Sequence, residues 1–211
     1  MLSIIQAAGW PIGFLIACSV VGLALILERA WSLRRARVAP AGLLDEAITA
    51  SRHGVPPLNV IEQLAQHSLL GEVLAAGLLA LHHHPQATEA ELRAALEGAG
   101  RRAAARLQRY LGALATVASA APLLGLLGTV IGMIEIFGSQ AGPGGLLPGG
   151  GNPAQLAHGI SVALYNTAFG LIIAVPALIF WRIYRARADA LLLELELAAE
   201  RFVHHLLTLR R

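Results

Sequence analysis

The sequence predicts an all-α integral membrane protein with three transmembrane helices and long cytoplasmic helical extensions. Three observations lead to this prediction. Of the 211 residues, 56% are hydrophobic and only 14% are charged, which is too apolar for an ordinary soluble domain. Three apolar stretches are long enough to cross a hydrocarbon core of about 30 Å. All sixteen basic residues are arginine, and most of them flank these stretches on one side.

The three spans divide the chain into segments. Residues 1–28 comprise the N-terminus and the first span, whose apolar run covers about 12–27. The second span covers residues 111–137 and the third covers residues 156–183. A shorter apolar run, LLGEVLAAGLLAL at 69–81, contains an acid and is too short to cross a bilayer, so a packed helix is expected there.

The arginines predict an orientation. Four follow the first span, four precede the second and three follow the third, whereas the N-terminus and the loop 138–155 contain none. Because cytoplasmic flanks are rich in basic residues, we expect residues 29–110 and a C-terminal helix over 184–211 in the cytoplasm. The N-terminus and the Gly/Pro-rich loop 138–155 are expected outside. The net charge of +3 then reflects membrane topology, and nucleic acid is not expected as a partner.

The predicted cytoplasmic segment consists of helices. Helices are expected over 40–52, 60–67 and 69–83, separated by Gly and Pro. Thr88 is a predicted N-cap because two acids follow it in the first turn. From there one helix of about 50 residues is expected to run to Phe137, with a kink near Pro122. Asn152 is a predicted N-cap of the third span, with Pro153 at the first helical position. The helix of this span is expected to continue through the C-terminal tail.

The second and third spans each contain small and polar residues that a lipid-facing helix does not need. On a helical wheel at about 100° per residue, these residues fall on one narrow face of each span. They are Gly125, Gly128, Thr129 and Gly132 in the second span, and Gly159, Ala163, Asn166, Thr167, Gly170 and Ala174 in the third. Such faces allow close helix packing, to which we also assign Pro122. They could equally line a narrow conduit, with Thr129, Asn166 and Thr167 as its hydrogen-bonding groups.

Glu135 is the only acid between Tyr110 and Trp181. An acid within a span is a functional candidate, but Glu135 lies near the outer end of the second span. It is therefore interpreted as a solvated interfacial acid, or as a cation-attracting group at an outer mouth. The histidines at 82–84, 204 and 205 are interpreted as solvated side chains. The sequence contains no zinc spacing, phosphate-binding loop or nucleophile elbow, so no metal, cofactor or enzyme active site is expected.

The motifs PLLGLLGTVIGMIEIF at 122–137 and GISVALYNTAFGLIIAVPALIFWRIYR at 159–185 resemble the MotA/TolQ/ExbB proton-channel family. Three spans and an outward N-terminus place the resemblance in the ExbB/TolQ branch. It implies a ring oligomer, a homopentamer, in the bacterial inner membrane around the single spans of an ExbD- or TolR-like partner. That partner carries a membrane aspartate, and the resemblance implies that Thr129 and Thr167 face it. It further implies a TonB- or TolA-like effector.

The sequence departs from the family pattern at several positions. Val162 stands where many members have glutamate, and Asn166 stands where many have alanine or threonine. The outer loop is also longer than usual. The expected function is a proton-channel and stator subunit that couples the proton motive force to mechanical work. Two alternatives remain: a passive oligomeric membrane scaffold, and a self-sufficient ion channel that uses Glu135.

Overall fold

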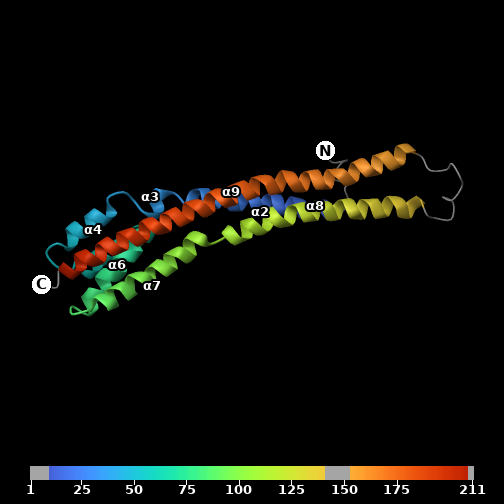
Figure 1. Ribbon diagram of the computed structural model, residues 1–211. Coiled ribbons are helices and arrows are strands. Elements are labelled where there is room, and N and C mark those ends of the chain that lie inside the picture. The colour runs from blue at the N-terminus through green and yellow to red at the C-terminus, as the bar shows by residue number, and fades with distance from the viewer. Residues whose placement is uncertain (1–9, 141–152, 209–211) are drawn as a thin grey trace. The chain divides into compact units, whose positions relative to one another are not determined.

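The computed structural model describes residues 10–140 and 153–208, and every regular element in these ranges is an α-helix. Three stretches, in α2 (Pro11–Ser32), in α7–α8 and in α9 (Pro153–Thr208), are long and apolar enough to cross a membrane (Figure 1). The chain divides into two compact units, which are described separately. The span unit comprises Met1–Leu27 and Tyr110–Arg182, and the extension unit comprises Glu28–Arg109 and Ile183–Arg211.

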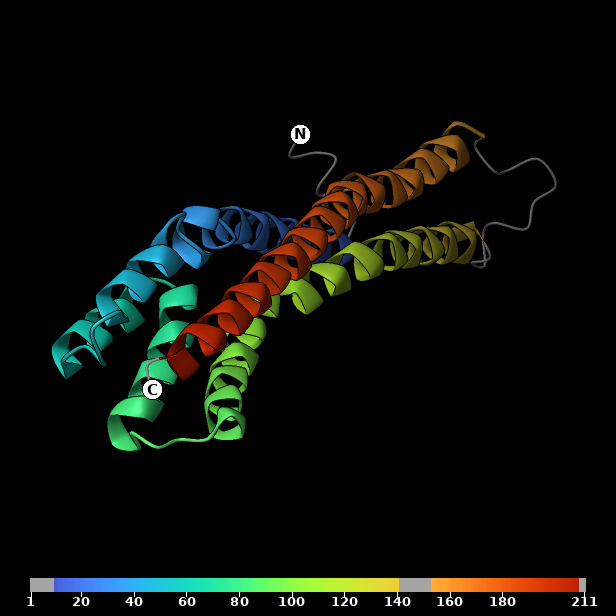
Figure 2. The same ribbon diagram turned by 60° about the vertical axis from the view of Figure 1, so that its left-hand side comes forward.

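The span unit contains most of α2, all of α8 (Leu111–Gln140) and the first half of α9. In both views α8 and α9 lie side by side in this unit (Figures 1 and 2). Helix α2 packs against the first half of α8, where Leu15 and Leu114 are almost completely buried. A Cβ atom added at Gly22 would lie 3.3 Å from the side chain of Val117. A glycine in α2 therefore permits close contact between these two helices.

The two longer spans extend slightly beyond their predicted limits. Helix α8 continues to Gln140, and α9 begins at Pro153, where proline is favoured because the first helical N–H has no intrahelical partner in any case. Asn152, the predicted N-cap, lies outside the described residues, as does most of the loop 138–155. Pro122 lies inside α8, which continues on both sides of it.

The extension unit is a cluster of short helices packed around longer ones. It contains α3 (Arg35–Val38), α4 (Leu43–Ser51), α5 (Leu58–His67), α6 (Leu69–His83), α7 (Glu89–Gln108) and the second half of α9. Helix α6 packs against both α5 and α7. Large apolar side chains are buried in this unit: Leu33, Val38, Ile61, Val73, Leu74, Leu78, Leu92, Leu195, Phe202 and Leu206. Burial of apolar surface therefore holds it together.

The predicted helices of this segment are confirmed, with one short addition. Helices α4, α5 and α6 overlap the three predicted ranges, whereas the sequence does not predict α3. Helix α7 follows Thr88 as predicted, and Thr88 forms a capping box with Glu91, in which each side chain bonds the other residue's backbone N–H. Two backbone N–H groups at the start of α7 are thereby satisfied.

The predicted single helix from Thr88 to Phe137 is wrong. Helix α7 ends at Gln108, and α8 begins at Leu111 after Tyr110, whose φ of 63° lies in the left-handed region that bulky residues avoid. A side chain from a distant part of the sequence accounts for the break. The buried guanidinium of Arg29 donates hydrogen bonds of 3.4 Å to the carbonyl oxygens of residues 106 and 107, at the end of α7. It thereby satisfies acceptors that a continuing helix would have used.

Helix α9 is unbroken from Pro153 to Thr208, a length of 56 residues that includes Pro176. The predicted continuation of the third span into a C-terminal helix is therefore confirmed. Within the extension unit this helix buries Leu195 and Phe202, whereas Leu193 and Leu197 are more than half exposed. It presents one apolar face to the other helices of the unit and leaves further leucines at the surface.

Candidate functional site: the contact between α8 and α9

The small faces of the second and third spans meet each other within one chain. A Cβ atom added at Gly125 of α8 would lie 2.7 Å from the carbonyl oxygen of Asn166 and 3.0 Å from the Cα atom of Thr167. A Cβ atom at Gly170 of α9 would lie 2.6 Å from the carbonyl oxygen of Ala121. Because each of these close atoms belongs to the backbone, a larger residue at either glycine would push the helices apart. The two glycines therefore set the distance between α8 and α9.

The contact continues towards the end of α8 and the start of α9. Gly132 faces Ala163, since a Cβ atom at position 132 would lie 3.2 Å from that of Ala163. Ala163 and Ala174 are both buried on α9. Gly159 is predicted on the same face, but its environment lies outside the described residues, as does that of Val162.

Asn166 is the buried polar residue of this contact. Only 2% of its surface is exposed. Its side chain occupies the space that glycine leaves at position 128, because a Cβ atom at Gly128 would lie 2.7 Å from Nδ2 and 2.8 Å from Cβ of Asn166. Gly128 and Asn166 are therefore matched in size, because the glycine on α8 leaves the space that the amide side chain on α9 fills. A hydrogen-bonding group is thus held between two apolar spans, where its burial is costly.

The two threonines predicted to be functional have different surroundings. The hydroxyl of Thr129 donates a 2.7 Å hydrogen bond to the carbonyl oxygen of Leu126 in its own helix. Thr129 also borders a shallow hollow on α8, together with Met133 and Phe137. The hydroxyl of Thr167 is buried and has no hydrogen-bond partner in the part of the chain that the structure describes. Buried polar groups normally have partners, so Thr167 retains an unused capacity to donate and accept.

Two further predicted residues lie beside this contact rather than in it. Glu135 is exposed near the C-terminal end of α8. Pro122 is half-buried in α8, three residues before Gly125. The structure therefore leaves Glu135 outside the group that it brings together: Gly125, Gly128, Gly132, Ala163, Asn166, Thr167 and Gly170.

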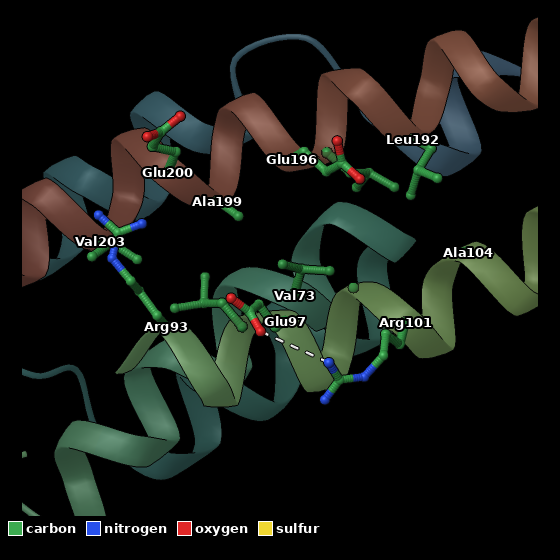
Figure 3. A pocket seen from close by; sticks show the side chains of 13 residues that line it. Val73, Arg93, Glu97, Arg101, Ala104, Leu192, Glu196, Ala199, Glu200 and Val203 are labelled. Carbon is green, nitrogen blue, oxygen red and sulfur yellow. Dashed lines mark ion pairs between the residues drawn. The ribbon is translucent and has the colours of Figure 1, made fainter. Parts of the chain in front are cut away.

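A second concave surface lies in the extension unit, and the sequence analysis does not predict it. Figure 3 shows a groove between α7 and α9, which Val73 of α6 also lines. Its volume is about 520 Å³. Its apolar lining includes Leu96, Leu192, Leu195 and Val203, and its charged lining consists of Arg93, Glu97, Arg101, Glu196 and Glu200. One sequence feature could have indicated this groove. In α9, leucine and alanine alternate with glutamates at helical spacing, which is typical of a helix with one apolar and one acidic face.

The two α7 arginines of this groove have partners on their own helix. Arg93 pairs with Glu89 at 2.9 Å, and Arg101 pairs with Glu97 at 3.8 Å, the pair drawn as a dashed line in Figure 3. Among the described residues, neither Glu196 nor Glu200 forms an ion pair, and both are exposed. The α9 wall of the groove therefore carries two negative charges that are open to a cationic ligand.

The histidines fall into two groups. His82, His83, His84 and His204 are exposed, and within the described ranges no cluster of three or more His, Cys, Asp or Glu side chains could hold a metal ion. His205 differs, because it is half-buried and has a partner instead of being fully solvated as expected. Its Nε2 atom lies 2.9 Å from Oγ of the buried Ser51 in α4. Burial, reinforced by the positive charge of Arg52, lowers the pKa of His205 below its ordinary value.

Comparison with known proteins places this architecture in a family. Residues 65–197 match the model of the MotA/TolQ/ExbB proton channel family. The chain is 32% identical over 193 residues to the biopolymer transport protein exbB1 of Vibrio cholerae, covering 89% of this chain and 78% of that protein. It is 29% identical over 189 residues to the Tol-Pal system protein TolQ of Pseudomonas aeruginosa, covering 84% and 78%.

A third relative is longer than this chain. A putative biopolymer transport protein of Synechocystis, ExbB-like 1, is 32% identical over 172 residues, which is 80% of this chain but 64% of that protein. The chain therefore spans slightly less than two thirds of that relative.

Proposed function

The chain belongs to the MotA/TolQ/ExbB proton channel family, and on that premise we propose that it is a stator subunit for energy transduction. In this proposal it couples the proton motive force to mechanical work on an envelope-spanning effector of the TonB or TolA kind. It would be a multi-pass protein of the bacterial inner membrane, with its N-terminus in the periplasm and its C-terminus in the cytoplasm. The one-sided distribution of arginine supports this orientation.

The observation that carries the proposal is a polar contact between two spans that lack a central acid. Asn166 and the hydroxyl of Thr167 are buried between α8 and α9, yet the sequence from Tyr110 to Trp181 contains no carboxylate except the exposed Glu135. Asn166 and Thr167 can offer hydrogen bonds along a proton path, but neither side chain takes up and releases a proton near neutral pH. We therefore assign the carboxylate that does so to a partner.

We assign the carrier to a single-span partner of the ExbD or TolR kind, whose membrane aspartate would accept and release protons. Thr129 would hydrogen-bond this carboxyl group, and so would Thr167 once its side chain rotates out of the contact between α8 and α9, with Asn166 holding the surrounding helices in place. The hydroxyl of Thr129 can switch from the carbonyl oxygen of Leu126 to an outside acceptor, because a threonine hydroxyl rotates to suit its surroundings. Five copies of this chain around the partner spans complete the proposed assembly.

The test is proton flux into liposomes under an imposed pH gradient, with and without the partner. Flux is expected only with the partner, and only while its membrane aspartate is intact. Flux from this chain alone that falls in Glu135→Gln would instead identify a self-sufficient channel. A complex that assembles but never conducts, and whose activity in cells does not depend on the proton motive force, would identify a passive scaffold.

The threonine roles are tested separately. Thr129→Val together with Thr167→Val keeps the side-chain shape and removes both hydroxyls. Flux with the partner is expected to fall by at least about tenfold, because a group that takes part in proton transfer contributes at least this much to the rate. The matched control is Thr116→Val, because Thr116 also lies on α8 and also bonds its own backbone, at 3.0 Å from the oxygen of Gly112. Undiminished flux in the double variant would contradict the proposed path.

A further inference from the structure

The groove between α7 and α9 has the properties of a peptide-binding site. Its lining includes four buried apolar side chains, which form an apolar floor: Val73, Leu96, Leu195 and Val203 (Figure 3). The lining runs over residues 93–104 of α7 and 192–203 of α9, so the groove is about 16 Å long, or three helical turns. A segment of about eleven helical residues, or about five extended ones, would fill it.

The charged side chains of the groove indicate which class of ligand it can bind. Arg93 and Arg101 pair with glutamates of their own helix, whereas Glu196 and Glu200 form no ion pair among the described residues. The two glutamates lie four residues apart on α9, so they form one negative edge along the apolar floor. The complementary ligand is an amphipathic segment with an apolar face and a basic flank.

A second copy of this chain does not meet that requirement through its exposed leucines. Leu193 and Leu197, surface leucines of α9, lie in the same turns as Glu196 and Glu200. If that surface entered the groove of a neighbouring copy, the glutamates of both copies would approach one another. Repulsion between these like charges disfavours such a contact.

We infer that this groove binds the basic cytoplasmic segment that flanks the membrane span of the single-span partner. The inference rests on the proposed function, which supplies the partner and places the extension unit in the cytoplasm. A span whose end lies in the cytoplasm is flanked there by Lys and Arg, next to its own apolar residues. Such a flank has the amphipathic and basic character that the groove requires.

The experiment is disulfide crosslinking in the membrane-embedded complex. Cys18, the single cysteine, is replaced by serine, and Ala199→Cys places a thiol in the groove. The partner receives one cysteine at each position of its cytoplasmic flank in turn. A disulfide to the partner is expected at positions that recur with helical or extended spacing. Gln63→Cys, exposed on α5, is the control and is expected to give none.

Charge reversal tests the proposed recognition. Glu196→Lys with Glu200→Lys is expected to lower the crosslink yield by about tenfold, since each reversed surface contact shifts binding by a few-fold. Reversing the partner's basic residues is expected to restore the yield. The control is Glu62→Lys on α5, which is also exposed and should leave the yield unchanged.

The outcomes separate this inference from the proposed function. A partner that copurifies and supports proton flux but gives no crosslink overturns the inference and leaves the function intact. A disulfide between two copies bearing Ala199→Cys overturns it in favour of a contact between subunits. A partner that does not copurify overturns both proposals.

Discussion

The span unit and the extension unit are both made of helices, but different side chains hold them together. Of the twelve largest fully buried side chains among the described residues, only Leu15 and Leu114 belong to the span unit. There, α8 and α9 meet through glycine, alanine and one asparagine. In the extension unit the contacts are made by leucine, valine, isoleucine and Phe202. Apolar side chains gain little from leaving lipid for protein, so close backbone approach replaces hydrophobic burial in the span unit.

The largest expected effect comes from the extension unit. Phe202→Ala removes a completely buried ring, and we expect it to cost about 3–5 kcal/mol of that unit's stability. Thermal unfolding of the purified protein should show one transition moved to lower temperature. Leu197→Ala on the same helix, where the side chain is 52% exposed, is the control and should change little. Equal effects of the two changes would contradict the assigned core.

A smaller but sharper effect is expected in the span unit. Gly125→Ala places a methyl group 2.7 Å from the carbonyl oxygen of Asn166, and we expect it to cost about 1–3 kcal/mol. Gly112→Ala, also on α8, has no atom within 4 Å of the new methyl and should be neutral or slightly stabilising. The free energy of unfolding in lipid or detergent measures both effects.

Measurement of the unfolding free energy also tests the size match between Gly128 of α8 and Asn166 of α9. Gly128→Ala meets side-chain atoms of Asn166, whereas Gly125→Ala meets its backbone oxygen. Asn166→Gly removes Nδ2, Cγ and Cβ, so it should relieve the first substitution and leave the second unrelieved. If Asn166→Gly relieved both equally, side-chain size would not be what separates the helices.

An effect of similar or smaller size is expected at the break between α7 and α8. Arg29→Met keeps the length of the side chain and removes its hydrogen bonds to residues 106 and 107 together with its ion pair to Glu28, at an expected cost of about 1–3 kcal/mol. Hydrogen exchange should become faster in the last turn of α7. Arg35→Met removes only an exposed ion pair with Glu194 and should cost less than about 1 kcal/mol. Unchanged exchange in the Arg29 variant would show that the break does not depend on this side chain.

The smallest effect is a dependence of stability on pH. Because the pKa of His205 is lowered in the folded chain, the unfolded chain binds a proton first as the pH falls. Stability of the extension unit is therefore expected to decrease as the pH falls below about 6.5, the ordinary histidine value. In pH-dependent unfolding, His205→Gln should remove this part of the dependence, and His204→Gln, at an exposed position, should keep it. A shared response of both variants would assign the effect to another group.

The elements themselves can be predicted from the sequence, because their signals are local. Apolar length, arginine placement and the Thr88 cap identify helices without any knowledge of the fold. The break at Tyr110 cannot be predicted in this way, since no glycine or proline marks the stretch 106–111. The residue that satisfies the end of α7, Arg29, lies 77 residues away from Arg106 in the chain. Only the packed structure brings these groups together.

The candidate site also combines features that the sequence can predict with features that only the packed structure reveals. A helical wheel identifies the small faces of both spans, because their spacing is periodic. It cannot show that the two faces oppose each other within one chain, nor that Gly128 accommodates Asn166. For the same reason the sequence alone favours a solvated His205, since its partner Ser51 lies 154 residues earlier. The functional roles of Thr129 and Thr167 stay predictions.

The unbroken length of α9 has a consequence for the way the two units unfold. One boundary between them lies inside α9, at Arg182 and Ile183, whereas the boundary at Tyr110 coincides with the break between α7 and α8. One continuous run of backbone hydrogen bonds in α9 therefore belongs to both units. Because helix formation is cooperative, fraying of α9 on one side of Ile183 should loosen the adjoining turns on the other side.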